Sequence, residues 1–179
     1  MQVSKITKII ELDPQRLDFT IKVRVLRKWN IRSKYNPNEV WLTEMILMDE
    51  EGDVIQSTLF KNLLHKFQGQ LLEGFAYLIV SPTLRMKNET FLLREQQNKI
   101  NFLPTTIVIN SPNFTTTGNG FSFADFPLIL SDHFPTNQFI DVIGAVVEKP
   151  IMDTSKQRHL LEIKLQNFQF EHSISCKYT

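Results

Sequence analysis

The sequence is poor in cysteine, in glycine and in long apolar runs. Cys176 is the single cysteine of 179 residues, so no intramolecular disulfide can form and a cysteine-based metal site would lack ligands. No apolar run approaches the ~18 residues of a membrane span. We therefore expect a reducing compartment, no metal and no membrane partner.

Catalytic motifs are also absent. The sequence has no Gly-rich phosphate loop ending in Gly-Lys-Ser or Gly-Lys-Thr, no Gly-x-Ser-x-Gly and no His-Glu-x-x-His. Its four histidines are scattered along the sequence. We expect a protein that is not an enzyme and needs no cofactor.

What is present is typical of a folded, strand-rich protein. Hydrophobic residues make up 42% and charged residues 22%, and 14 Phe against 2 Trp and 3 Tyr favour pleated strands. The net charge is only +1, but residues 1–103 carry 15 basic and 12 acidic residues, whereas residues 104–179 carry 5 and 7. The positive charge therefore belongs to the first half.

The alternation of apolar and polar residues over 19–25 predicts a first strand with one buried face. Arg27 and Trp29 stand at the next two odd-numbered positions, which would continue the buried face. Either the strand bends and exchanges its faces there, or Trp29 reaches the surface. Further along, the pattern predicts strands over 40–48, 54–60, 75–81 and 89–95, an acidic turn at 49–53, a helix over 61–73 and a polar turn at 82–88.

This order of elements predicts a mainly β protein: a five-stranded OB-fold Greek-key barrel with one short helix, in residues 1–103. Other small mixed barrels would give the same order. Residues 104–137 read as a linker, although Phe121, Phe123 and Phe126 indicate that it packs on a domain. Residues 138–179, with strands expected over 139–147 and 159–168, predict a partial second OB-like sheet.

The stretch 22–34 holds six basic residues and no acidic one. In an OB barrel the loop after the first strand borders the ligand groove, where cations neutralise phosphates and flat side chains accept bases. A basic edge that blocks strand pairing would give the same composition. The candidate binding residues are Arg24, Lys28, Trp29, Arg32 and Lys34.

Two phenylalanines are candidate stacking residues. Ile55 and Leu59 share one face of the third strand, which leaves Phe60 on the other face. Phe91 follows the polar turn that carries Arg85 and Lys87. The pattern alone leaves open whether Phe60 and Phe91 stack on bases at the two ends of one groove or belong to the core.

The run IKVRVLRKWN, followed by MDEEGDVIQSTLFKNLLHKFQGQLLEGFAYLIV, LRMKNETF and INFLPTT, resembles the first DNA-binding OB domain of the replication protein A large subunit, most closely in its plant-like group. The resemblance implies that Phe60 and Phe91 stack on bases and that Arg85 is a basic residue beside the groove. Gln56 stands where the family has a basic residue. The resemblance covers residues 5–149, and the second domain it implies would be incomplete.

The expected function is single-stranded DNA binding in DNA replication, repair or recombination, in the nucleus. Expected partners are single-stranded DNA, other replication protein A subunits, or a protein docking on the C-terminal half-barrel. The alternatives are an OB module that binds only protein and a module that binds RNA, because stacking and phosphate contacts do not read the 2′-OH.

Overall fold

The computed structural model describes residues 5–16, 18–87, 92–93, 96–116, 118–131, 137–153, 160–169 and 171–178. The chain forms two compact units, residues 1–120 and 121–179. Residues 104–120, assigned to a linker from the sequence, belong to the first unit, because β8 (Ile107–Asn110) pairs with its sheet through β4 (Ala76–Val80). In the described part of the chain, no helix has the length and hydrophobicity needed to cross a membrane.

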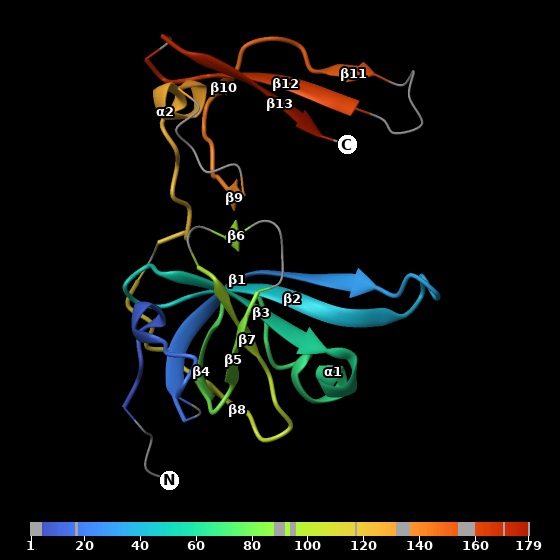
Figure 1. Ribbon diagram of the computed structural model, residues 1–179, viewed down its shortest axis with the longest axis vertical. Helices are drawn as coiled ribbons and strands as arrows, with labels where there is room; N and C mark the ends of the chain where they lie inside the picture. The colour runs from blue at the N-terminus through green and yellow to red at the C-terminus, as the bar shows by residue number, and fades with distance from the viewer. Residues whose placement is uncertain are drawn as a thin grey trace. The chain divides into compact units, whose positions relative to one another are not determined.

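The first unit is a curled seven-stranded sheet with the order β5-β7-β3-β2-β1-β4-β8 (Figure 1). β5 and β4 lie far apart in this order, yet only Ser81 and Pro82 separate them along the chain, so the sheet closes on itself. They are two halves of one strand, broken where Ser81 takes a φ of 52°. The other strands are β1 (Thr20–Arg32), β2 (Val40–Met48), β3 (Val54–Phe60), β5 (Thr83–Met86) and β7 (Asn98–Asn101).

The predicted OB-fold barrel is thereby confirmed, with β7 as its fifth strand, parallel to β3. The inward face of each strand fills the barrel, and Phe67 and Phe102 meet with their ring centroids 5.3 Å apart. These side chains bury enough apolar surface to stabilise the closed sheet. The core includes Ile21, Val23, Val25, Met45, Leu47, Ile55, Leu59, Leu63, Phe67, Ile79 and Ile100.

A β-bulge explains why Arg27 and Trp29 of β1 are exposed although they continue the series of buried positions. Its pairing with β2 shifts register between Val25 and Arg27, and beyond this point Trp29 pairs with Glu44. The strand bends there and exchanges its faces, which brings Trp29 to the outside of the barrel. The β1–β2 hairpin then extends beyond the body of the barrel (Figure 1).

The helix is shorter than predicted. α1 (Lys61–Phe67) buries Leu63 and Phe67, and the chain turns after it through Gly69. Glycine is among the poorest helix formers, so the helix ends before Gly69. Leu71, the last residue of the predicted apolar stripe, is still buried after the turn. η1 (Ile9–Glu11) is a short 3-10 helix before β1.

The end of the barrel differs from the prediction. The residues 83–86, predicted as a turn, form β5 with Leu84 buried and Arg85 exposed. Of the predicted strand 89–95, the structure describes only β6 (Leu92–Leu93). The pairing strand is β7, which was missed because Ile100 is its single apolar residue.

The second unit is a partial sheet. β12 (Leu160–Gln166) pairs on one edge with β10 (Ala145–Val146) and β11 (Ile151–Asp153), and on the other with β13 (Ser173–Tyr178). The strand expected over 139–147 is broken into β9 (Gln138–Phe139) and β10, and β13 was not predicted. α2 (Phe126–Leu130) precedes this sheet and buries Phe126.

Candidate functional site

A row of side chains crosses five strands on the outer face of the barrel. Cα partners in a ladder project to the same side of the sheet, so their side chains form continuous rows. At ~4.8 Å between strands, a row of five spans about 20 Å. The row contains Arg85, Lys99, Gln56, Ile46 and Arg27.

The next row contains an aromatic residue and a buried acid. Trp29, at 42% exposure, pairs with Glu44, which pairs with Thr58. The Glu44 carboxylate accepts hydrogen bonds from Gln56 Nε2 at 3.0 Å and from Thr58 Oγ1 at 2.8 Å. These bonds fix the Gln56 side chain against Glu44 of the neighbouring row.

Phe60 ends β3 on the outer face, opposite Leu42. Its neighbour Leu59 is fully buried, as is Ile55, whereas Phe60 is 40% exposed. The predicted division of this strand into a core face and an outer face is therefore confirmed. Phe91, the second predicted stacking residue, lies outside the described residues.

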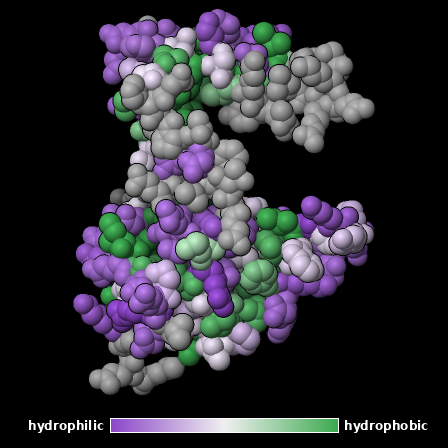
Figure 2. All heavy atoms as spheres, in the orientation of Figure 1, coloured by the Kyte–Doolittle hydropathy of each residue, from purple (hydrophilic) through white to green (hydrophobic). Residues whose placement is uncertain are grey.

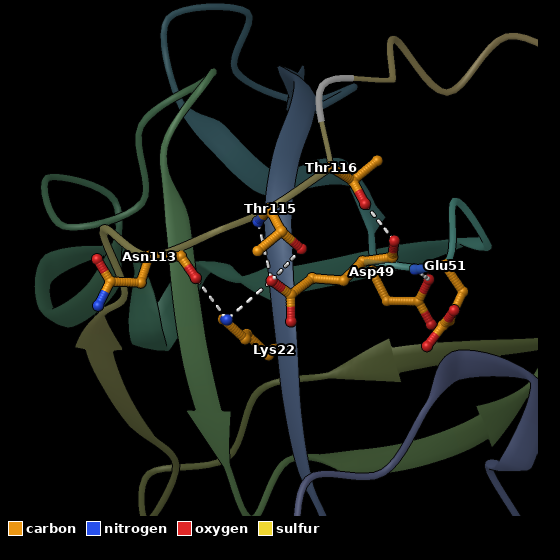
Figure 3. A network of polar contacts seen from close by, with 7 residues as sticks. Lys22, Asp49, Glu51, Asn113, Thr115 and Thr116 are labelled. Atoms are coloured by element: carbon orange, nitrogen blue, oxygen red, sulfur yellow. Dashed lines mark hydrogen bonds and ion pairs between the residues drawn. The ribbon is translucent and has the colours of Figure 1, made fainter.

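Part of the basic stretch holds a chain segment against the barrel (Figure 3). Lys22 Nζ donates to Glu50 Oε1 at 2.8 Å and to the carbonyl of Asn113 at 2.5 Å, and the Arg24 guanidinium lies 4.6 Å from the centroid of the Phe114 ring. Lys22 and Arg24 thus fasten the segment 113–116.

Glu50 is the centre of this network. Its Oε1 also accepts hydrogen bonds from the backbone N–H and the hydroxyl of Thr115, at 2.9 and 3.0 Å. The hydroxyl of Thr116 donates to the Glu50 carbonyl. The hydrogen bond from Lys22, with those from Thr115, lowers the pKa of Glu50 below its ordinary value, against a smaller opposing effect of burial.

Lys28 faces the protein rather than the outer face. Its ammonium donates to the carbonyls of Gln68 and Leu71 at 2.6 and 2.7 Å, and its backbone N–H donates to Glu73. Burial lowers the pKa of Lys28, while the nearby Glu73 carboxylate acts in the opposite direction.

The remaining predicted cations lie in different surroundings. Arg32 Nη1 donates to the carbonyl of Pro37 at 2.8 Å within the β1–β2 loop, where Lys34 is exposed. Arg85 is exposed at one end of the five-strand row. The Lys87 side chain is buried, and its backbone N–H donates to Gln97.

The sequence pattern missed three residues of this face. Lys99 comes from the strand that was not predicted, Glu44 was one of several polar residues on an expected strand, and Arg27 was counted only within the basic stretch. Lys99 is placed on this face by the parallel pairing of β7 with β3, in which it lies opposite Gln56. Periodicity within one strand cannot reveal a pairing between residues so far apart in the sequence.

The outer face combines flat apolar side chains with cations. Hydrophobic and hydrophilic residues are mixed over the first unit in the view of Figure 2. Such a surface can stack planar groups and neutralise anions along one path. Within the described ranges no group of three or more His, Cys, Asp or Glu could hold a metal ion.

The barrel and its helix between β3 and β4 define the class of the fold, an OB fold, and the similarity to known proteins shows that it is of the replication protein A type. The chain is similar to the solved structure of a replication protein A heterotrimer bound to ssDNA, with a TM-score of 0.57 and 25% identity over 97% of this chain and 41% of that chain.

Residues 10–132 match the family described as "Domain of unknown function DUF223", and the chain belongs to that family. It is 28% identical over 145 residues to a replication protein A 70 kDa DNA-binding subunit of Arabidopsis thaliana, covering 79% of this chain and 24% of that protein. It is 35% identical over 89 residues to the replication protein A 70 kDa DNA-binding subunit of Danio rerio, covering 49% and 15%. The chain thus spans a quarter or less of the length of these relatives.

Proposed function

We propose that this chain binds single-stranded DNA on the outer face of its OB barrel and acts, without catalysis, in DNA replication, repair or recombination in the nucleus. The observation that carries the proposal is the row from Arg85 to Arg27, with Trp29 and Phe60 beside it. Its relatives are named as DNA-binding subunits, and the similar solved structure contains ssDNA.

In this mechanism bases stack on Phe60, Trp29 and Phe91, and every base offers a π-face, so recognition tolerates any sequence. Arg27 and Arg85 neutralise phosphates at the two ends of the row and release counterions. Arg32 and Lys34 extend the cationic path along the β1–β2 loop. Arg24 and Lys28 contact other parts of the first unit and so support the fold that carries the site.

The test is a titration of the whole chain with single-stranded DNA, double-stranded DNA and RNA of one sequence at two salt concentrations. We expect the single strand of DNA to bind more tightly than the duplex, and binding to weaken with salt. Equal or tighter RNA binding would make this an RNA-binding protein, and no binding to any of the three would overturn the proposal.

A second candidate function, protein docking, is favoured by the exposed apolar residues of the second unit. Val146, Ile151 and Met152 are each more than half exposed on the sheet in which β13 pairs with one edge of β12, and Phe139 of β9 is also more than half exposed. A sheet of this kind can accept a strand from a partner such as another replication protein A subunit. A pull-down of this chain with the purified second and third subunits of replication protein A tests this candidate, and no retention of either subunit would contradict it.

A further inference from the structure

A hollow of about 480 Å³ lies where β2 and β3 meet α1. This volume is within the range of ligand-binding sites. Two aromatic side chains line it, Phe60 and Trp41, and Trp41 is 54% exposed. Its other lining residues are Lys61, Asn62 and His65, from the first turns of α1.

Trp41 does not belong to the rows of the outer face. It is adjacent to Leu42, which pairs with Phe60, and neighbouring residues of a strand point to opposite sides. Phe60 both ends the outer face and lines the hollow. Phe60 is therefore shared by the outer face and the hollow.

The chemistry of the lining suits a nucleotide. Two aromatic rings offer faces to a base, and the Asn62 amide carries a donor and an acceptor for a base edge. Lys61 forms an ion pair with Glu39, in which the two side chains are 51% and 38% exposed. Exposed pairs of this kind are weak, so a phosphate can replace the Glu39 carboxylate at little cost.

We propose that this hollow is a further nucleotide subsite, which takes the nucleotide next to the one stacked on Phe60. The inference rests on the proposed function, because the same strand must first occupy the outer face. The aromatic walls alone would also suit a peptide, but the sharing of Phe60 with the outer face and the presence of Lys61 favour the nucleic acid strand.

The test measures the affinity of the whole chain for oligothymidylates of about 4 to about 16 nucleotides, the range of OB-fold site sizes. Trp41→Ala should leave the affinity for the shortest oligonucleotides that bind unchanged and weaken binding of the longest about tenfold, the loss expected for one stacked base. Trp41→Phe should retain the wild-type length dependence. Phe75→Ala, which removes an exposed aromatic side chain outside the hollow, should have no effect at any length.

The outcomes separate the two proposals. If wild-type protein binds no oligonucleotide, the proposed function fails and the subsite with it. If wild-type protein binds but Trp41→Ala matches it at every length, only the subsite is wrong and the hollow is left for a peptide. Equal weakening at all lengths, with an unchanged melting temperature, would place Trp41 in the main site and also contradict the inference.

Discussion

At the scale of residues, neighbouring positions of one strand differ in what they contact. Leu59 is buried in the barrel while Phe60 is on the outside, and Lys28 binds two backbone carbonyls while Arg27 lies in the five-strand row. The two-residue period of a strand produces these contrasts. Each pair therefore supplies a test residue and its own control.

Phe60→Ala should weaken single-stranded DNA binding by about 1–3 kcal/mol and leave the free energy of unfolding nearly unchanged, because its ring is outside the core. Leu59→Ala should lower the free energy of unfolding by about 2–5 kcal/mol and leave the affinity per folded molecule unchanged. Urea denaturation and fluorescence anisotropy measure the two quantities. The reverse pattern would place Phe60 in the core.

At the scale of elements, the segment 113–116 is part of the first unit because side chains of β1 and of the turn 49–53 hold it. The segment continues to Gly120, whose φ is +75° and where a Cβ would lie 2.1 Å from Leu26 Cδ1. The positive φ therefore favours glycine at this position, and any other residue would also require the Leu26 side chain to move.

Glu50→Gln should lower the free energy of unfolding at pH 7 by about 1–2 kcal/mol, because the charged hydrogen bond from Lys22 is lost. The pKa of Glu50 is lowered in the folded state, so its stabilisation is complete above the ordinary value of 4.5 and is lost as the pH falls through the folded pKa. The difference between variant and wild type should therefore shrink in acid.

The control is Glu51→Gln in the same turn. Glu51 pairs with Lys8 in an ion pair with both side chains half exposed, so this variant should change stability little at any pH. Thermal melts from pH 3 to 8 compare the two. A Glu50→Gln difference that stays constant down to the lowest pH would show that the carboxylate charge is not what fastens the segment.

The elements that could be predicted from the sequence are those with strong local patterns. The bounds of β2 and β3 match the prediction because each has a clear apolar face bounded by turn residues. β5 and β7 could not be found, since each buries one apolar residue and is defined by its partner. The contacts of Lys28 and Arg24 could not be predicted either, because Lys28 binds backbone carbonyls after α1 and Arg24 lies over the Phe114 ring, both far away in the sequence.

At the scale of the whole molecule, the barrel has its own core, and the proposed binding face lies within residues 1–120. A chain shortened to these residues should keep nearly full affinity for single-stranded DNA. In the full chain, amide exchange in β12 and β13 should be faster than in β1 to β3, because exposed apolar residues and few strands leave that sheet less stable.

Anisotropy titrations of the full and shortened chains, with hydrogen exchange of the full chain, measure these quantities. A tenfold loss of affinity on shortening would show that the second unit is a working binding site. Slower exchange in β12 than in β3 would show that the partial sheet is stable by itself.

The central claim is that phosphates are neutralised along the row across the barrel. It is tested most directly by the slope of log K against log salt for single-stranded DNA, in wild type and in the Arg27→Met, Arg85→Met double variant. At about 0.7 per neutralised phosphate, the slope should fall by about 1.4 in the double variant and stay unchanged in Lys28→Met, whose ammonium binds carbonyls. An unchanged slope in the double variant would contradict the account, because the phosphate path would then lie elsewhere on the molecule.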